Sequence, residues 1–214
     1  MNDVKIIYHG HAMFEIISSA GTGIIIDPYD EQVKQVLPDV AAGIVLVSHG
    51  HFDHNNVSLV RGNPVIVRDS QPRVIDGIKI KGLNTYHDAN RGQLRGGNII
   101  FQFTVDEVTF AHMGDLGHLP DQSVFEELGG IDVLMIPVGG IYTINASMAL
   151  GIVEKLKPAV VLPMHYKERD SKLGVDTVDG FLSRFETFSV KDHSVVVSKS
   201  SLPERTEVWV LKSS

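Results

Sequence analysis

Seven consecutive residues, Ser48–His54, carry three imidazoles and one carboxylate in the sequence SHGHFDH. They directly follow the short apolar run IVLV, which is typical of a buried strand. A loop at the end of a strand can fold back and direct alternate side chains towards one point. His49, His51, Asp53 and His54 would then offer ligands of the kind that first-row divalent metals take. The density of this cluster, in a chain with 10 His among 214 residues, favours a metal site over a capped loop with unrelated histidines.

Three further donors follow apolar strands elsewhere in the chain, each without an intervening helix. They are His87, Asp115 and His165. Strand ends of this kind can line the same edge of a sheet, so we expect these side chains to converge on Ser48–His54. A site for two metals requires about three or four protein ligands per metal, which one loop does not supply. The combined set predicts a dinuclear site.

The composition limits the classes of protein to which the chain can belong. Hydrophobic residues make up 43% and charged residues 21%, as in ordinary globular proteins, and 214 residues can bury a substantial core. The lack of cysteine excludes disulfides and Cys-ligated zinc, so His, Asp, Glu or water must hold any metal. The formal net charge of −7 argues against nucleic acid as a partner and favours a small-molecule substrate.

The chain shows no sequence signal for a membrane or a secretory pathway. No apolar run approaches the roughly 18 to 20 residues that cross a bilayer. The first residues, MND, do not introduce a basic region followed by an apolar stretch, so we expect a cytoplasmic protein. The oligomeric state is left open by the sequence.

Short apolar, β-branched runs dominate the first half and predict strands, whereas the second half alternates strands with helices. Two helices are predicted, residues 145–157 with Asn145 as N-cap and residues 176–188 with Asp176 as N-cap. The predicted strands are residues 4–8, 14–18, 23–26, 44–47, 64–67, 78–80, 98–104, 108–111, 132–138, 159–164, 195–198 and 206–211. This order predicts an α/β protein, with packed sheets covered by helices, in one domain over residues 1–214.

The motifs together resemble the metallo-β-lactamase superfamily. The resemblance rests on HxHxDH at residues 49–54, a later histidine, a Gly-Asp pair that ends a strand, and a final histidine after another strand. Four further motifs resemble the branch of small metal-dependent hydrolases related to ascorbate-phosphate lactonase: GHA at residues 10–12, HMGDLG at 112–117, PVGG at 137–140 and PMHY at 163–166. The resemblance implies an αββα four-layer sandwich with the metals at one edge.

The resemblance also implies a role for each donor. His49, His51 and His87 would hold the first metal, Asp53, His54 and His165 the second, and Asp115 would bridge both. Two divalent metal ions are therefore expected, with Zn favoured and Mn or Fe as alternatives. Asp53 and Asp115 are the expected catalytic carboxylates.

Three residues are expected beside the metals. Asp27 matches an early Asp of the family and suits the orientation of a histidine ligand, although an Asp-Pro turn would explain it equally. His11 belongs to the Gly-His-Ala motif and is expected to approach the site. His112 competes with His87 for the first metal, because the usual Gly-His-Thr context of that ligand is absent around His87. We interpret His112 as a neighbour of the ligands.

Four other residues are candidates for contact with the substrate. Arg91 and Arg95 lie in a Gly-rich loop after His87 and could present a guanidinium to an anionic substrate, unless the loop is simply solvated. Tyr142 and Thr143 precede the predicted helix at residues 145–157, whose N-terminus is a natural place for an anion. The alternative is that they only begin the helix.

The leading hypothesis is a metal-dependent hydrolase that cleaves a small ester, lactone or phosphoester with a hydroxide bridging two metals. The second is an iron-dependent redox enzyme of the same fold, such as a sulfur dioxygenase. The third is a catalytically idle metal-binding domain. The complete ligand set argues against the third hypothesis, because structural sites tend to be closed by their ligands.

Overall fold

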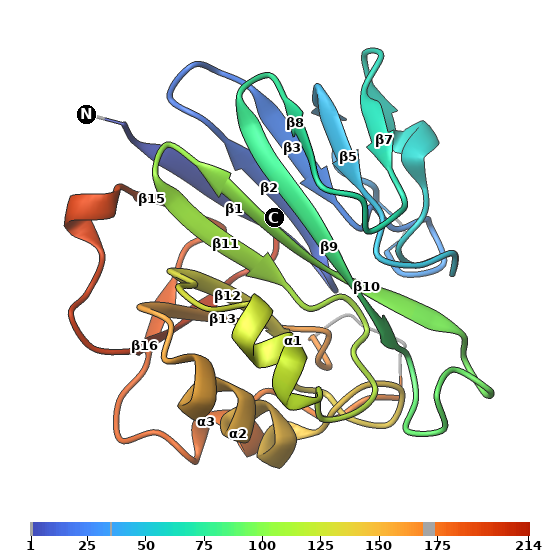
Figure 1. Cartoon of the computed structure of the whole chain (residues 1–214), viewed down its shortest axis with the longest axis vertical. Helices are drawn as coiled ribbons and strands as arrows, with labels where there is room; N and C mark the ends of the chain where they lie inside the picture. The colour runs from blue at the N-terminus through green and yellow to red at the C-terminus, as the bar shows by residue number, and fades with distance from the viewer. Residues whose placement is uncertain (1, 35, 169–173) are drawn as a thin grey trace.

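Two mixed β-sheets pack face to face, and the α-helices lie on the outer side of one of them (Figure 1). The computed structural model describes residues 2–34, 36–168 and 174–214. No helix within these ranges has both the length and the apolar character needed to cross a membrane. The predicted α/β class with packed sheets is confirmed.

The first sheet joins the amino-terminal strands to a strand near the carboxyl terminus. Its order over the described residues is β15-β1-β2-β3-β5-β7. The strands are β1 (Val4–Gly10), β2 (Met13–Ile17), β3 (Gly23–Ile26), β5 (Ile44–Leu46), β7 (Val65–Val67) and β15 (Ser194–Val197). Because β1 and β3 are both antiparallel to β2, and β5 is parallel to β3, strands β1, β3 and β5 all end at the same edge.

The second sheet follows the same principle with more strands. Its order over the described residues is β14-β16-β13-β12-β11-β10-β9-β8. The strands are β8 (Arg73–Ile75), β9 (Ile78–Tyr86), β10 (Gly97–Val105), β11 (Val108–His112), β12 (Val133–Pro137), β13 (Val160–Met164), β14 (Ser189–Lys191) and β16 (Glu207–Leu211). Both β9 and β11 are antiparallel to β10, and β12 and β13 continue parallel to β11, so β9, β11, β12 and β13 end at one edge.

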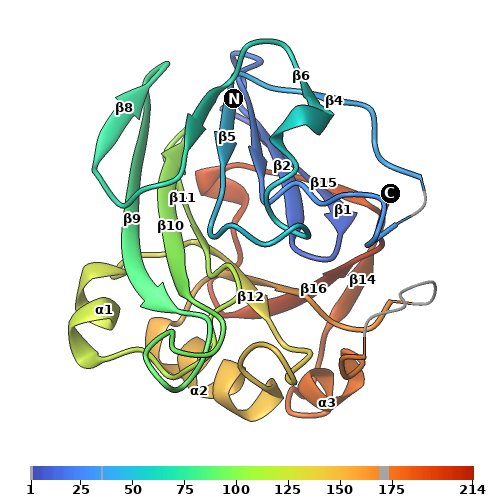
Figure 2. The ribbon, with the colours of Figure 1, turned by 90° about the vertical axis from the view of Figure 1, so that its right-hand side faces the viewer.

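The main core lies between the two sheets. Phe14 of the first sheet and Phe101, Phe103 and Phe110 of the second are at most 1% exposed in this layer. Burial of one such side chain contributes about 1.5–3 kcal/mol, and together these contacts fix the relative position of the strand ends. A second core lies between the second sheet and the helices α1 (Gln122–Glu127), α2 (Ala146–Leu156) and α3 (Asp179–Leu182), as Figure 2 shows from the side.

The outer face of the first sheet is covered by turns and a small ribbon. The ribbon pairs β4 (Val40–Ala41) with β6 (Val60–Arg61), and the 3₁₀ helix η1 (Val57–Leu59) precedes it. Buried Tyr29 and Val45 pack beneath this cover. The expected αββα sandwich has a layer of α-helix on this side as well. The described residues form no α-helix there.

One of the two predicted helices is confirmed, and the other is wrong over most of its length. Helix α2 is confirmed, with Asn145 as its N-cap accepting hydrogen bonds from the backbone N–H groups of Ser147 and Met148, both at 3.0 Å. The helix predicted over residues 176–188 is wrong beyond Asp179–Leu182. Asp176 does not cap it, because its backbone bonds Gly139 and Lys167 instead.

The residues after α3 do not continue the predicted helix. Residues 183–188 form turns and irregular backbone, Phe188 is 48% exposed, and the chain pairs with β16 only from Ser189, in β14. The apolar spacing after Leu182 therefore matches a helix by chance. Helix α1, the edge strands β8 and β14, the 3₁₀ helix η2 (Lys199–Ser201) and the ribbon β4–β6 were not predicted.

Candidate metal centre

The predicted donors lie at one edge of the molecule. In each sheet, the strands that run in the same direction end at this edge. The first sheet contributes His11 after β1, Asp27 after β3 and the loop Ser48–His54 after β5. The second sheet contributes His87 after β9, Asp115 after β11 and His165 after β13. The residues that leave β1, β3 and β13 all have left-handed backbone, with φ of 57° at His11, 48° at Asp27 and 50° at His165. Such conformations cost about 1–3 kcal/mol each and concentrate at functional sites.

The first cluster consists of His49, His51 and His87. One ligand atom from each lies within 4.8 Å of the others, a spacing that a single metal ion can bridge. His49 and His87 are buried, whereas His51 is exposed. The two sheets thus share this cluster, with two histidines from the first and one from the second.

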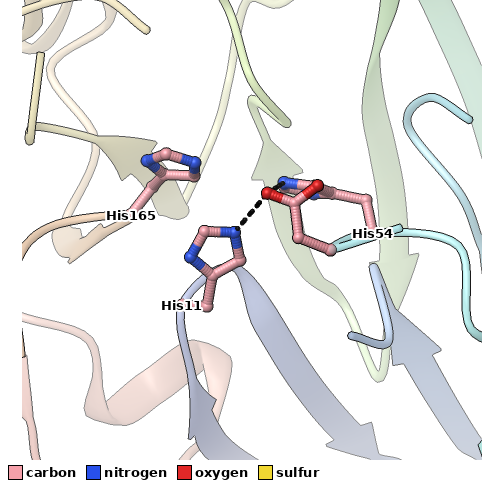
Figure 3. A group of neighbouring side chains, drawn as sticks. His11, His54 and His165 are labelled. Carbon is pink, nitrogen blue, oxygen red and sulfur yellow. Dashed lines mark hydrogen bonds and ion pairs between the residues drawn. The ribbon is translucent and has the colours of Figure 1, made fainter. Parts of the chain in front are cut away.

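The second cluster consists of His11, Asp53, His54 and His165, whose ligand atoms also lie within 4.8 Å of one another. Figure 3 shows the imidazoles of His11, His54 and His165 converging from separate elements. His11 Nε2 lies 3.1 Å from Asp53 Oδ2, the contact that is dashed in Figure 3. The sequence led us to expect His11 only near the metals, whereas the structure places its imidazole among the potential metal donors.

Asp115 lies between the two clusters. Its Oδ2 is 3.2 Å from Nε2 of His87, in the first cluster, and 3.2 Å from Nε2 of His165, in the second. Its Oδ1 is 3.2 Å from Nε2 of His54. Asp115 is 1% exposed, so its carboxylate is surrounded by these imidazoles and not by solvent. This position is the one that a bridging ligand would need.

Several buried donor atoms at this centre have no hydrogen-bond partner among the described residues. They are His49 Nε2, His54 Nε2, His87 Nδ1, His165 Nδ1 and Asp115 Oδ1. Buried polar atoms are almost always paired, so an accumulation of unpaired ones at a single place calls for a missing partner. Imidazole and carboxylate without thiolate are a donor set that zinc and other divalent metals accept. The clusters therefore fit a binuclear metal site.

Asp27 and Ser48 determine which nitrogen of two histidines faces the centre. Asp27 Oδ2 accepts from Nδ1 of His54 at 2.8 Å and from Oγ of Ser48 at 2.6 Å. Since the Ser48 proton points to Asp27, Ser48 Oγ accepts from Nδ1 of His49 at 3.0 Å. Both imidazoles are thereby left with Nε2 directed at the centre, the arrangement that outer partners of metal ligands produce.

Burial and charge set the protonation of the centre. Burial, followed by the field of His54, lowers the pKa of His49 from 6.5 to about 3. Burial, followed by His165, lowers the pKa of His11 to about 4. Burial opposes ionisation of Asp115, but His165 and His54 hold its pKa well below 3.8. For His54 burial acts against the charged form, but Asp115 and Asp27 outweigh it and raise the pKa well above 6.5.

His87 and His112, the competing candidates, occupy different environments. His87 belongs to the first cluster, as described above. His112 is fully buried, and both of its nitrogens bond the backbone: Nδ1 accepts from Gly114 N–H at 3.1 Å and Nε2 donates to the carbonyl of Ala12 at 2.9 Å. This engagement leaves no nitrogen of His112 for a metal.

Asn98 and Gly114 position Asp115, and the sequence analysis missed both. Asn98 Oδ1 accepts from the backbone N–H of Asp115 at 2.9 Å, and Asn98 Nδ2 donates to the carbonyl of Met113 at 2.9 Å. Gly114 has φ of 55°, and a Cβ there would collide with Asn98 and Ser48. The only signal for Asn98 in the sequence is a polar residue near the start of the strand β10, next to the apolar run Ile99–Phe101.

The loop that carries Arg91 and Arg95 is organised by Asp88, another residue that the sequence analysis missed. The Asp88 carboxylate accepts four backbone N–H groups, from Asn90, Gly92, Leu94 and Arg95, at 2.7–3.0 Å. Arg95 lies over the Tyr142 ring at 5.5 Å from its centroid, so this loop contacts the one after β12. Within the described residues no hydrogen bond or ion pair joins Arg91 or Arg95 to the clusters.

Tyr142 and Thr143 precede helix α2 as expected, but the helix N-terminus is already occupied. Asn145 takes the N–H groups of Ser147 and Met148. Thr143 Oγ1 donates to the carbonyl of Ile144 at 3.2 Å, and Tyr142 is 40% exposed beside Arg95. This geometry favours a simple helix start over an anion site at α2.

Comparison with known proteins agrees with this architecture. A family model described as the β-lactamase superfamily domain matches residues 5–165. A UPF0173 metal-dependent hydrolase of Thermoplasma acidophilum is 30% identical over 196 residues, covering 79% of this chain and 86% of the relative. Another, from Thermococcus kodakarensis, is 33% identical over 191 residues, covering 76% and 84%.

A solved structure from Thermotoga maritima extends the similarity to the whole fold. It is a candidate Zn-dependent hydrolase of the metallo-β-lactamase superfamily, 35% identical to this chain. The two structures superpose with a TM-score of 0.82, covering 97% of this chain and 98% of the other. The chain therefore belongs to the metallo-β-lactamase superfamily and, within it, to the UPF0173 family of metal-dependent hydrolases.

Proposed function

We propose that the protein hydrolyses a small ester, lactone or phosphoester at a binuclear centre. The observation that carries the proposal is the position of Asp115, whose carboxylate lies 3.2 Å from imidazoles of both clusters. Two divalent cations held there would lower the pKa of a shared water from 15.7 towards about 7 and so supply a hydroxide nucleophile at neutral pH. Zinc is the favoured metal because the Thermotoga maritima neighbour is described as Zn-dependent.

The donors expected from the sequence divide between the two metals as follows. His49, His51 and His87 would hold the first metal. Asp53, His54 and His165 would hold the second, and Asp115 would bridge both. The low pKa values of His49 and Asp115 keep an imidazole lone pair and a carboxylate charge available at neutral pH. The raised pKa of His54 reflects a field that favours positive charge at Nε2, and a metal would replace the proton there.

The substrate of this proposal is a small molecule with an anionic group. Arg95 lies on the loop that follows His87 and is held there by two contacts, its backbone N–H on Asp88 and its guanidinium over Tyr142. Arg91 is exposed on the same loop and adds a second positive charge. The resemblance to ascorbate-phosphate lactonase that the sequence motifs led us to expect makes phosphorylated lactones the first substrates to try.

Metal analysis and a substrate panel test the proposal together. Protein purified without added metal should contain two zinc ions per chain and hydrolyse at least one of a set of lactones, carboxylic esters and phosphoesters. Asp53→Ala should abolish that turnover while leaving the fold intact, whereas His193→Ala should not change it. A single iron with oxygen consumption would contradict the proposal and favour the redox alternative, as would turnover that survives in Asp53→Ala.

A further inference from the structure

His11 occupies the turn between β1 and β2 in a conformation that is costly for a histidine. Its φ is 57°, in the left-handed region, and the residue is 4% exposed. Non-glycine residues in this region are strained and persist only where the surroundings impose them. A turn that served only to connect two strands would be less strained with glycine or asparagine at this position.

Four polar contacts impose this turn. Glu168 Oε1 accepts from the N–H of His11 at 3.0 Å, and the carbonyl of His11 accepts from the backbone N–H of His165 at 2.7 Å. The single proton of the Tyr8 hydroxyl is shared between Glu168 Oε1 at 2.8 Å and the carbonyl of His11 at 3.0 Å. The backbone of His11 is thus tied to the end of β13, which presents another member of the second cluster.

Gly10 shows how closely the surrounding groups approach the turn. Its φ is 103°, and a Cβ there would lie 2.7 Å from Lys34 Nζ and 3.2 Å from Glu168 Oε1. Lys34 Nζ in turn lies 3.8 Å from Glu168 Oε2 and donates to the carbonyl of His9 at 2.9 Å. Glu168 therefore sits between a cation and the His11 backbone, which fixes its own position.

The neighbouring His9, near the end of β1, shows the contacts of a structural histidine. Its two nitrogens lie 2.9 Å from Ser214 Oγ and 3.0 Å from Glu15 Oε2, neither of which belongs to a cluster. The Nε2 of His11 instead lies 3.1 Å from Asp53 Oδ2, and its ring centroid is 4.3 Å from that of His165 and 5.1 Å from that of His54. The residues that the His11 imidazole contacts in this way, Asp53, His54 and His165, all belong to the second cluster.

We propose that His11 is a direct ligand of the second metal, and that Glu168 and Tyr8 are positioning residues that hold its turn. This inference rests on the proposed function. The burial that lowers the pKa of His11 also leaves it neutral, as a ligand must be, but the geometry carries the assignment. The second metal would then have His11, Asp53, His54 and His165 as donors besides Asp115.

The test measures zinc affinity rather than turnover. His11→Gly removes the imidazole and relaxes the left-handed backbone, so loss of metal cannot be attributed to strain. We expect the second zinc to bind about 100-fold more weakly and the first to bind as in the wild type, measured by competition with a chromophoric chelator. His11→Asn, which also tolerates this backbone, should behave alike. His9→Asn is the matched control and should retain both affinities.

The positioning role is tested at Glu168. Glu168→Ala removes the acceptor for the His11 N–H and should weaken the second zinc by about 10-fold. Glu168→Gln keeps a carbonyl oxygen at the same place and should restore most of that affinity. A crystal structure with zinc should show His11 Nε2 at about 2.0–2.1 Å from the second metal.

The outcomes separate this inference from the proposed function. If the wild type fails to bind two metals, the proposed function fails with the inference. If the wild type binds two zinc ions and His11→Gly binds both with unchanged affinity, only the inference is overturned. A zinc-loaded structure in which His11 Nε2 remains hydrogen-bonded to Asp53, away from the metal, would overturn it as well.

Discussion

The first and second clusters prepare their donors for a metal in different ways. The first offers three histidines, one of them exposed, and its ordering partner is the hydroxyl of Ser48. The second is more deeply enclosed, contains the carboxylate of Asp53, and is anchored by Asp27 below His54. With Asp115 counted for both, the second metal would meet two carboxylates and the first only one.

This difference in charge predicts which of the two metals binds more tightly. The attraction between a divalent cation and a carboxylate is strong where water is excluded, and the second cluster has both more charge and less solvent. A fixed outer partner such as Asp27 also reduces the reorganisation that binding requires. The second cluster is therefore expected to retain its metal when the first has lost its own, and the following changes test that asymmetry.

Removing the shared carboxylate should produce the largest effect because it affects both clusters. In Asp115→Asn we expect fewer than two metals per chain and a loss of turnover of about 10³-fold or more. Elemental analysis and steady-state kinetics measure the two effects. Asp76→Asn, a surface aspartate with φ of 48°, is the matched control and should change neither. Two tightly bound metals in Asp115→Asn would show that the clusters do not share this ligand.

Removing a ligand from one cluster should distinguish the metals. His87→Ala should lose the first metal and keep the second, as measured by metal content after dialysis. His112→Ala should keep both, because neither nitrogen of His112 is free. It should nevertheless lower the free energy of unfolding by about 2 kcal/mol, since it leaves the Ala12 carbonyl and the Gly114 N–H unpaired. If His112→Ala loses a metal and His87→Ala does not, their roles are exchanged.

Weakening the anchor of the second cluster should have a smaller effect. Asp27→Asn removes the charge that holds His54 Nδ1 directly but acts on His49 only through Ser48, so the second metal should bind about 10- to 100-fold more weakly and the first should be weakened less. Competition with a chelator measures both constants, and Asp76→Asn again serves as control. Equal weakening of the two metals would contradict the separation of the clusters.

The smallest expected effect is the pH dependence of the metal-free protein. Burial lowers the folded-state pKa of His49 to about 3 and that of His11 to about 4, against 6.5 when unfolded. Between about pH 4 and 6.5 the unfolded chain binds more protons, so stability rises with pH. The raised pKa of His54 reverses the slope above 6.5, where the folded state holds the extra proton.

Urea unfolding in the presence of a chelator should therefore give a maximum of stability near pH 6.5. His49→Ala should flatten the rise on the acid side, because it removes one of the histidines whose pKa burial lowers. A free energy of unfolding that falls steadily from pH 4 to 6.5 would contradict the neutral state of these imidazoles.

The sequence alone determined the strands that carry the donors and most of the donors themselves. An apolar run followed directly by His or Asp is a local pattern, so the loop Ser48–His54 and the positions of His87, Asp115 and His165 could be located from it. Helix α2 was also predictable, because its apolar spacing, the cap at Asn145 and the stop at Pro158 are all local signals.

Only the tertiary structure decided how those residues combine. The place of His11 in the second cluster, the contacts of Asp27 with Ser48 and His54, and the support of Asp115 by Asn98 all join residues far apart in the chain. Local spacing contains no information about such pairs, and it misled at residues 176–188, where only Asp179–Leu182 form an α-helix. Donor types follow from the residues, whereas their convergence follows from strand direction and sheet packing, which are properties of the whole fold.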